Sequence, residues 1–213
     1  MREGAGLGGF ITFEGIDGSG KTTQIQLLAD RLRQVGCSVL SLREPGGTAV
    51  GEQIRNILLN PANTDLTDTS ELLLFGAARA QLMQTVIRPA LESGAVVICD
   101  RFTDSTTAYQ GYGRGYALAE IEQINRMATG GTRPDRTFLL EVPPEVCAAR
   151  IRENRGGMDR LDGEVRSFME RVQHGYSAVA RSEPDRVVVI AADQPVQTIA
   201  DQIFQIITEE MTL

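Results

Sequence analysis

Short apolar runs alternate along this chain with longer segments in which apolar residues recur at helical spacing. The runs predict five buried strands, at residues 10–13, 38–42, 95–99, 137–142 and 186–190. The longer segments predict helices at 22–35, 49–59, 70–91, 119–128, 144–152, 164–181 and 195–209. Nearly continuous apolar strands that alternate with helices are typical of a parallel sheet covered on both faces. We therefore predict a doubly wound α/β fold, with ligands at the carboxyl ends of the strands.

Length and composition favour one domain. The chain has 213 residues, of which 42% are hydrophobic, enough for a single α/β core with a small mobile insert. Residues 1–9 are rich in glycine and are expected to form a disordered extension before a domain at 10–213. There is no apolar run of 18 residues and no hydrophobic leader segment, so we predict a protein without a membrane partner.

Charge and cysteine content narrow the class of protein further. The formal net charge is −7, which argues against a nucleic-acid partner or an anionic membrane surface. The three cysteines, Cys37, Cys99 and Cys147, lie in apolar segments without the spacing of metal ligands. This pattern favours buried, reduced thiols and a cytoplasmic location. Of 21 basic residues only Lys21 is a lysine; the other 20 are arginines.

That lysine lies in a glycine-rich loop between the first predicted strand and the first predicted helix. The loop fits the pattern G-x-x-x-x-G-K-[ST] at every fixed position and consists of Gly15, Ile16, Asp17, Gly18, Ser19, Gly20, Lys21 and Thr22. Glycines allow successive N–H groups to surround a phosphate, and the helix that follows adds its positive end. We call residues 15–22 the phosphate loop. Its pattern predicts a site for a nucleoside triphosphate, with Lys21 as a catalytic cation.

Charged residues directly follow two of the other predicted strands. Asp100 comes after four apolar residues, a position from which it can orient Mg²⁺ together with Thr22, although an aspartate there can also cap a helix. Arg101 follows it, and Arg43 ends the second predicted strand. Two arginines at strand ends indicate a second anion, distinct from the one in the phosphate loop.

Four short segments resemble, in order and spacing, the motifs of thymidylate kinases, the bacterial enzymes that phosphorylate dTMP. They are Arg-Glu-Pro-Gly-Gly-Thr at 43–48, Phe-Gly-Ala-Ala-Arg at 75–79, Asp-Arg-Phe at 100–102 and Thr-Ala-Tyr-Gln-Gly at 107–111. The resemblance runs from about residue 10 to the end of the chain. It implies the fold of P-loop NTPases, transfer of a phosphoryl group from ATP to dTMP with Mg²⁺, and a homodimer packed through helices.

The resemblance also assigns residues to the acceptor. It makes Phe75 the ring on which thymine stacks and Arg79 the donor to a thymine carbonyl. The two lie four residues apart and so share one side of a helix, although spacing alone would equally allow Phe75 to be a core residue. Arg43 and Arg101 would bind the dTMP phosphate, and Tyr109 would crowd the sugar 2′ position. The remaining acceptor residues implied are Gln110 in the same pocket and Ser105 near the base.

On the donor side the resemblance implies a lid at residues 150–160 that closes over ATP. Asp17 would touch the sugar hydroxyl or a water on Mg²⁺. In this family an arginine that stabilises the transferring phosphoryl group comes from the phosphate loop or from the lid, and the loop here has Gly18 before Ser19. We therefore expect Arg155 to be the catalytic lid residue, with Arg150 and Arg152 as alternatives.

Three other classes of protein with a phosphate loop are alternatives to a thymidylate kinase: deoxynucleoside kinases, GTPase switches and regulatory ATPases. A deoxynucleoside kinase accepts an uncharged hydroxyl and needs a general base, which the Arg43 and Arg101 pair argues against. A GTPase switch needs an [NT]-K-x-D motif, and the chain has no second lysine to form one. A regulatory ATPase stays possible and would hydrolyse ATP without a nucleotide acceptor. The single histidine, His174, is expected to be a surface or packing residue.

Overall fold

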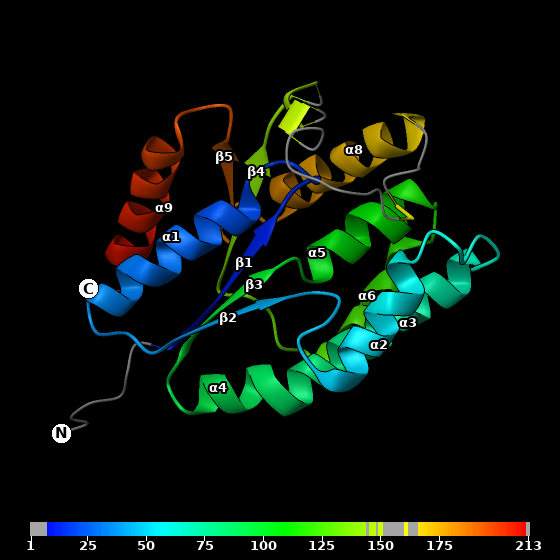
Figure 1. Ribbon diagram of the computed structural model, residues 1–213, viewed down its shortest axis with the longest axis horizontal. Coiled ribbons are helices and arrows are strands. Elements are labelled where there is room, and N and C mark those ends of the chain that lie inside the picture. Colours follow the sequence, from blue (N-terminus) through cyan, green and yellow to red (C-terminus); the bar gives the residue numbers. More distant parts are fainter. Residues whose placement is uncertain (1–7, 144, 148, 151–159, 162–165, 212–213) are drawn as a thin grey trace.

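The computed structural model describes residues 8–143, 145–147, 149–150, 160–161 and 166–211. Its centre is a parallel sheet with the strand order β2-β3-β1-β4-β5. The strands are β1 (Gly9–Glu14), β2 (Val39–Arg43), β3 (Val96–Asp100), β4 (Arg136–Glu141) and β5 (Val187–Ala191). The predicted five-stranded parallel sheet is confirmed. Because β1 lies between β3 and β4, the loop that follows β1 begins at the middle of the sheet's carboxyl edge (Figure 1).

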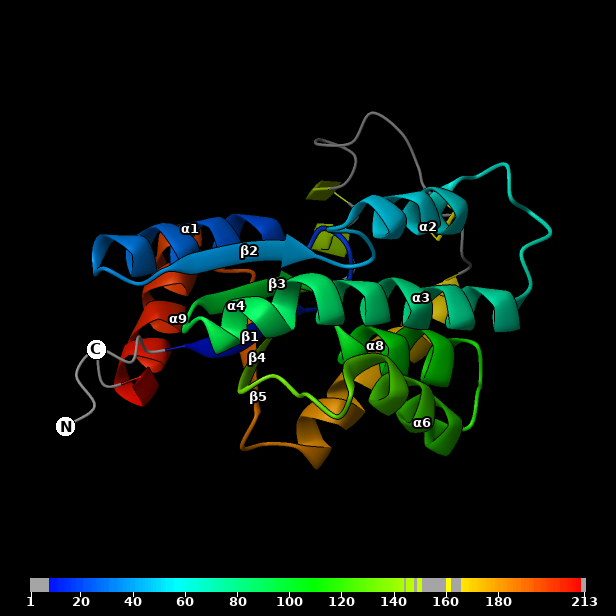
Figure 2. The same ribbon diagram turned by 90° about the horizontal axis from the view of Figure 1, so that it is seen from below.

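Helices cover the sheet and extend beyond its carboxyl edge (Figures 1 and 2). They are α1 (Lys21–Gln34), α2 (Ala49–Leu59), α3 (Asp68–Leu82), α4 (Arg88–Glu92), α5 (Thr103–Thr106), α6 (Leu118–Thr129), α8 (Arg166–Ser182) and α9 (Val196–Met211). The described residues also include two π-helical segments, η1 (Met83–Ile87) and η2 (Thr107–Gly113). Helix α1 packs on β1, β2, β3 and α9, whereas α4 packs on β3 and α8 packs on β5 and η2.

Alternation along the central strands divides the core. Val97 and Cys99 of β3 lie in a buried cluster with Leu82 and Ile87 from the run α3–η1. Their neighbours Val96 and Ile98 belong to the other cluster, which includes the buried side chains of α1, α8 and α9. Successive strand residues face opposite sides of the sheet, so a strand with no polar position must be covered on both. This packing makes β1 and β3 a rigid support for the residues that follow them.

Several elements differ in detail from the expectation. The predicted helix at 70–91 is a continuous run of α3, η1 and α4, with its first turn capped by Thr67. Helix α5 and segment η2 were not predicted, because residues 103–113 carry no helical hydrophobic repeat. Strand β1 begins at Gly9, and residues 1–7 of the expected extension lie outside the described residues. Of the expected helix at 144–152, residues 145–147 and 149–150 are described and helical.

Two properties bear on the expected class of protein. Among the described helices, none combines the length and the apolar character needed to cross a bilayer. Cys37, Cys99 and Cys147 are free thiols, and the latter two are buried. The prediction of buried thiols is confirmed for Cys99 and Cys147 but is wrong for Cys37, which lies between α1 and β2 and is only partly buried.

Candidate active site

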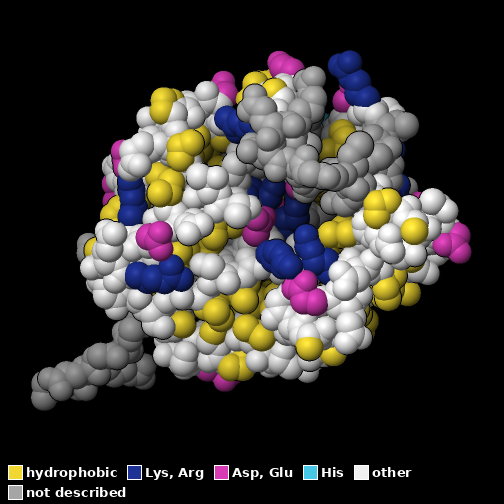
Figure 3. Space-filling view, in the orientation of Figure 1, with side chains coloured by type: hydrophobic (Ala, Val, Ile, Leu, Met, Phe, Trp, Pro, Cys, Tyr) yellow, Lys and Arg dark blue, Asp and Glu magenta, His cyan; other side chains and the backbone are white. Residues whose placement is uncertain are grey.

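A cavity of about 610 Å³ opens at the carboxyl ends of β1, β2 and β3. This volume suits ligands of nucleotide size. In Figure 3 basic side chains gather around a hollow near the centre of the face shown. The predicted site residues that line it are Asp17, Gly18, Ser19, Gly20, Lys21, Thr22, Arg43, Phe75, Arg79, Asp100, Arg101, Ser105, Tyr109, Gln110 and Arg150. Gly15 and Ile16 are the described site residues absent from this lining.

The phosphate loop has a backbone that only glycine allows at two positions. A Cβ on Gly15 would lie 2.6 Å from the Leu140 carbonyl oxygen, and one on Gly18 would lie 2.7 Å from that of Cys147. Both glycines also have positive φ angles. The loop therefore rests against β4 and the segment after it. Gly20 ends the loop as the left-handed residue before α1.

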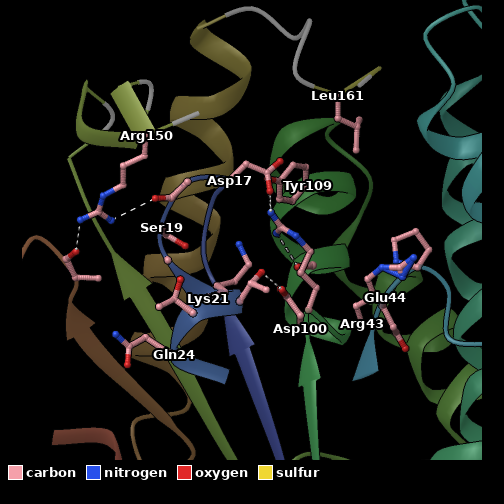
Figure 4. A pocket seen from close by; sticks show the side chains of 18 of the residues that line it. Asp17, Ser19, Lys21, Gln24, Arg43, Glu44, Asp100, Tyr109, Arg150 and Leu161 are labelled. Atoms are coloured by element: carbon pink, nitrogen blue, oxygen red, sulfur yellow. Dashed lines mark hydrogen bonds and ion pairs between the residues drawn. The ribbon is translucent and has the colours of Figure 1, made fainter. Parts of the chain in front are cut away.

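Lys21 begins α1 and reaches back into the loop. Its Nζ donates hydrogen bonds to the carbonyl oxygens of Gly15 at 3.0 Å and Ile16 at 3.1 Å. Burial lowers the pKa of this ammonium to about 8, and the Arg101 guanidinium adds to the shift. The Ser19 hydroxyl is buried and meets no hydrogen-bond partner among the described residues. Figure 4 shows Ser19 and Lys21 within the loop, where a phosphate would satisfy both groups.

Thr22 and Asp100 meet beside this loop. The Thr22 hydroxyl donates a 3.1 Å hydrogen bond to the Asp100 carboxylate at the end of β3. In the part of the chain that the structure describes, no group of three or more His, Cys, Asp or Glu side chains is arranged to hold a metal ion. A hydroxyl and a carboxylate beside a phosphate site suit Mg²⁺, which keeps several waters and takes its other ligands from phosphates.

Arg101 follows Asp100 in a left-handed conformation, with a φ of 68°. This backbone conformation costs a residue other than glycine about 1–3 kcal/mol. It turns the guanidinium toward the phosphate loop, where Nη2 donates to Asp17 at 2.9 Å. Nη1 donates to the hydroxyls of Ser105 and Tyr176, and the cation lies 5.2 Å from the centre of the Tyr109 ring. The predicted phosphate-binding arginine is thus held next to the loop.

Arg43 is held less firmly than Arg101. It ends β2 and forms an ion pair with Glu52 of α2, 3.0 Å from Nη2 to the carboxylate. Both side chains are more than 40% exposed, so the pair contributes little to stability. Glu52 also accepts the N–H of Gly47. An incoming anion could compete for Arg43 at small cost.

Arg79 is almost entirely enclosed, with 2% of its surface exposed. Its guanidinium donates to the Glu44 carboxylate at 2.8 Å, to the Thr106 hydroxyl and Asn125 amide oxygen, and to the Phe102 carbonyl oxygen. The predicted bond from Arg79 to the base thus competes with protein acceptors already in place. Phe75, one turn earlier on α3, is half-buried and lines the cavity.

Tyr109 and Gln110 lie on η2, and the wider turn of a π-helix is common at functional sites. Gln110 donates to the buried Glu71 carboxylate at 2.8 Å. Arg114 and Arg160 also bind this carboxylate, and Arg160 in addition contacts the end of α2 through the Leu58 carbonyl. Burial opposes ionisation of Glu71, but these hydrogen bonds hold its pKa below the usual value. One end of the expected lid therefore docks near Gln110.

Arg150, at the other end of the expected lid, contacts the phosphate loop. It donates to the carbonyl oxygens of Gly18 at 3.3 Å and Ala192 at 3.0 Å, as Figure 4 shows. Arg152 and Arg155 lie outside the described residues. The choice of Arg155 as the catalytic lid residue therefore stays a prediction.

Sequence reasoning missed four residues that support the site: Glu14, Glu52, Glu71 and Tyr176. Of these, Glu14 offered a signal, because it is an acidic residue directly after an apolar strand and directly before the phosphate loop. The others lie within helical patterns, where a charged or aromatic residue is ordinary. Their partners become evident only once the elements are packed together.

A phosphate loop at the centre of a parallel sheet, with an arginine at the neighbouring strand end, defines a phosphotransferase of the P-loop NTPase fold. The model of the thymidylate kinase family matches residues 13–203. The chain belongs to the thymidylate kinase family.

Individual relatives agree with this assignment. A thymidylate kinase from Exiguobacterium sp. is 47% identical over 204 residues, covering 96% of each chain. One from Pelotomaculum thermopropionicum is 51% identical and covers 88% of this chain and 87% of its own. The crystal structure of thymidylate kinase from Ehrlichia chaffeensis matches with a TM-score of 0.79 and 36% identity. It covers 94% of this chain and 98% of its own, so the likeness includes the whole fold.

Proposed function

We propose that this protein transfers the terminal phosphoryl group of ATP to dTMP, giving dTDP and ADP. The observation that carries the proposal is the ion pair between Arg101 and Asp17. It holds the Arg101 guanidinium directly beside the phosphate loop, which supports binding of the acceptor phosphate next to the donor phosphates. Two nucleotides bound to one cavity in this way present the acceptor phosphate to the transferring group, and such positioning supplies much of the catalysis in phosphoryl transfer.

On the acceptor side, Arg101 and Arg43 bind the dTMP phosphate and Phe75 stacks on thymine. Support comes from their shared cavity and from Arg43, whose exposed bond to Glu52 can be exchanged for a phosphate. Tyr109 lines the same cavity, where its ring would crowd the sugar 2′ position and so favour deoxyribose. A phosphate dianion that replaces Glu52 as the partner of Arg43 gains charge-assisted, bidentate hydrogen bonds.

On the donor side, the phosphate loop binds the ATP phosphates. The Lys21 ammonium follows the phosphoryl group as it is transferred. Thr22 and Asp100 would hold Mg²⁺. Asp17, which lines the same cavity, would touch the sugar hydroxyl or a water on the ion. When bound, the ion would neutralise charge on the phosphates. Arg150 braces the loop through Gly18, and Arg155 supplies the lid cation.

The reaction needs no histidine base, because the acceptor phosphate is already ionised near neutral pH. His174 does not line the cavity and packs its ring 5.6 Å from that of Tyr112 on η2. The Arg43 and Arg101 pair in the cavity lining supports phosphate-to-phosphate transfer over transfer to an uncharged hydroxyl, which would call for a base near the acceptor instead.

The test is ADP release with Mg²⁺ and ATP over a panel of nucleoside monophosphates and deoxynucleosides. We expect release with dTMP and little with AMP, CMP or thymidine. Activity with AMP or CMP but not dTMP would overturn the substrate assignment. Steady ADP release without any acceptor would instead favour a regulatory ATPase.

We also propose that the enzyme is a cytoplasmic homodimer. The free cysteines fit a reducing compartment. Helices α3 and α6 pack on each other and carry the exposed apolar side chains Leu73, Leu118 and Met127, the last 77% exposed. Light scattering after gel filtration should give twice the chain mass of 23.2 kDa, and Leu73→Glu should reduce it. A wild-type monomer would contradict the proposal.

A further inference from the structure

Glu14 connects the start of the phosphate loop to the turn that carries Arg101. It is the last residue of β1, and 1% of its surface is exposed. Its Oε1 accepts the N–H of Phe102 at 2.7 Å and that of Ser105 at 3.3 Å. Its Oε2 accepts the hydroxyls of Ser105 at 2.6 Å and Tyr176 at 3.1 Å. The carboxylate does not line the cavity, so no substrate contact explains this concentration of hydrogen bonds.

Two consecutive residues of β1 fix the backbone on both sides of Arg101. The Arg101 N–H donates to the Phe13 carbonyl at 2.9 Å, as the parallel pairing of β1 with β3 requires. At the next residue the backbone has turned away, and Phe102 donates to the Glu14 side chain instead. The left-handed conformation of Arg101 therefore depends on an acceptor that a side chain supplies, because strained backbone persists only where its surroundings determine it.

The same carboxylate reaches the Arg101 guanidinium through two hydroxyls. Arg101 Nη1 donates to Ser105 Oγ at 3.2 Å and to Tyr176 Oη at 2.9 Å. Both of these oxygens contact Glu14 Oε2. Each hydroxyl can accept from the cation and donate to the anion, so the two charges are joined by a polarised chain of hydrogen bonds.

We propose that Glu14 is a positioning residue for dTMP binding: it holds the strained turn and, through Ser105 and Tyr176, the guanidinium of Arg101. The proposal rests on the proposed function, in which Arg101 binds the acceptor phosphate. Burial and the nearby Asp104 carboxylate raise the pKa of Glu14 to about 7, whereas the Ser105 hydroxyl and the Arg101 charge oppose that shift. The Arg101 charge thus favours the ionised form of this buried carboxylate.

Glu14→Gln tests the charge while keeping the shape. The amide oxygen still accepts one set of bonds, but its NH₂ group now faces hydroxyl oxygens that already accept from Arg101. We expect the KM for dTMP to rise about 10-fold or more, since a hydrogen bond to a charged group is worth roughly that factor in binding. The KM for ATP should change by less than about threefold, because the donor site keeps its contacts.

Asp104→Asn is the matched control. Asp104 is a buried carboxylate on the same short helix as Ser105, and it binds Arg186 through both oxygens at 2.8 and 2.9 Å. Loss of the Asp104 charge favours the ionised form of Glu14, so this variant should lower the thermal midpoint without raising either KM value. A Glu14→Gln variant that behaves like the control, with lower stability and an unchanged KM for dTMP, would overturn the proposal.

Tyr176→Phe removes one bridging hydroxyl and keeps the ring. In the double variant Glu14→Gln with Tyr176→Phe, the KM for dTMP should be about threefold or more below the value expected from multiplying the two single effects. The reason is that both residues act through the same chain of hydrogen bonds. Strictly multiplicative effects would contradict the mechanism. If Glu14→Gln does not fold, Tyr176→Phe alone decides, since an unchanged KM for dTMP would then overturn the proposal.

Arg101→Ala separates this inference from the proposed function. If Arg101→Ala leaves the KM for dTMP unchanged, the assignment of Arg101 to the acceptor phosphate is wrong, and the role of Glu14 fails with it. If Arg101→Ala raises this KM but Glu14→Gln and Tyr176→Phe do not, the phosphate assignment stands and only the positioning role is overturned.

Discussion

The Thr22 hydroxyl donates a 3.1 Å hydrogen bond to the Asp100 carboxylate, although the two residues are 78 positions apart in the chain. The bond joins the first turn of α1 to the carboxyl end of β3. Because β3 is hydrogen-bonded to β1, from which the phosphate loop emerges, the sheet itself fixes this distance. Figure 4 shows Asp100 beside Lys21, below the loop.

If Thr22 and Asp100 hold Mg²⁺, Asp100→Asn should raise the Mg²⁺ concentration needed for half-maximal activity and lower kcat about 10- to 100-fold. The measurement is initial rate against Mg²⁺ at saturating ATP and dTMP. Thr22→Ser keeps the hydroxyl and should resemble wild type, whereas Thr22→Val should resemble Asp100→Asn. An unchanged Mg²⁺ dependence in Asp100→Asn would show that the metal binds to other residues.

Phe75→Ala should weaken dTMP binding without affecting ATP. Stacking between a base and an aromatic ring is worth about 1–3 kcal/mol, so the KM for dTMP is expected to rise about 5- to 150-fold. Phe75→Tyr keeps the aromatic face and serves as the control. Steady-state kinetics with each substrate varied in turn give the comparison. Equal changes in both KM values would show that Phe75 is a packing residue and does not stack on the base.

Arg79→Ala should cost both stability and acceptor binding. It leaves the buried Glu44 carboxylate without its partner, which typically destabilises a protein by about 3–5 kcal/mol. Burial already raises the pKa of Glu44, against the attraction of Arg79. The double variant Arg79→Ala with Glu44→Gln should recover much of the free energy of unfolding but not the KM for dTMP. Recovery of both would limit Arg79 to a structural role.

Arg155→Ala should lower kcat about 1,000-fold or more if this lid arginine stabilises the transferring group. Arg152→Ala serves as the comparison, because it removes an arginine from the same segment. Single-turnover rates with saturating nucleotides isolate the chemical step. A rate for Arg155→Ala no lower than that for Arg152→Ala would show that the catalytic arginine is another one.

The sequence predicted the sheet well because burial on two faces leaves a strong signal. Each strand shows an apolar run, and the observed bounds of β2 to β5 differ from the predicted ones by one residue at each end. The phosphate loop was equally clear, because its glycines are required where the backbone makes close contacts, such as that of Gly15 with Leu140. Local constraints of this kind are visible in a single chain.

What the sequence could not predict depends on contacts between distant elements. Segment η2 has no helical repeat, because its side chains divide between the cavity, α8 and the buried Glu71. Glu14 meets Tyr176 across 162 positions. Arg79 was expected to face the base, and its spacing gave no sign of the buried acceptors that now occupy it. Polar networks of this type require the packed structure.

The buried position of Lys21 makes ATP binding dependent on pH. Its pKa of about 8 in the free enzyme means that much of the population is neutral above pH 8. Bound phosphates favour the ammonium form and raise the pKa, so ATP binding should take up protons between the free and bound values. ATP affinity should accordingly fall as the pH rises above 8. Phosphate groups titrate at about pH 6 and do not contribute there.

Calorimetry at pH 8.5 in two buffers with different ionisation enthalpies measures this uptake directly. Lys21→Arg is the matched control, since a guanidinium stays charged over this range and should bind ATP without proton uptake. Lys21→Ala should fold and lose transfer, which separates the role of the cation from that of the fold. Equal proton uptake in wild type and Lys21→Arg would assign the titration to another group. Deprotonation of Lys21 would then not be the cause of the falling ATP affinity.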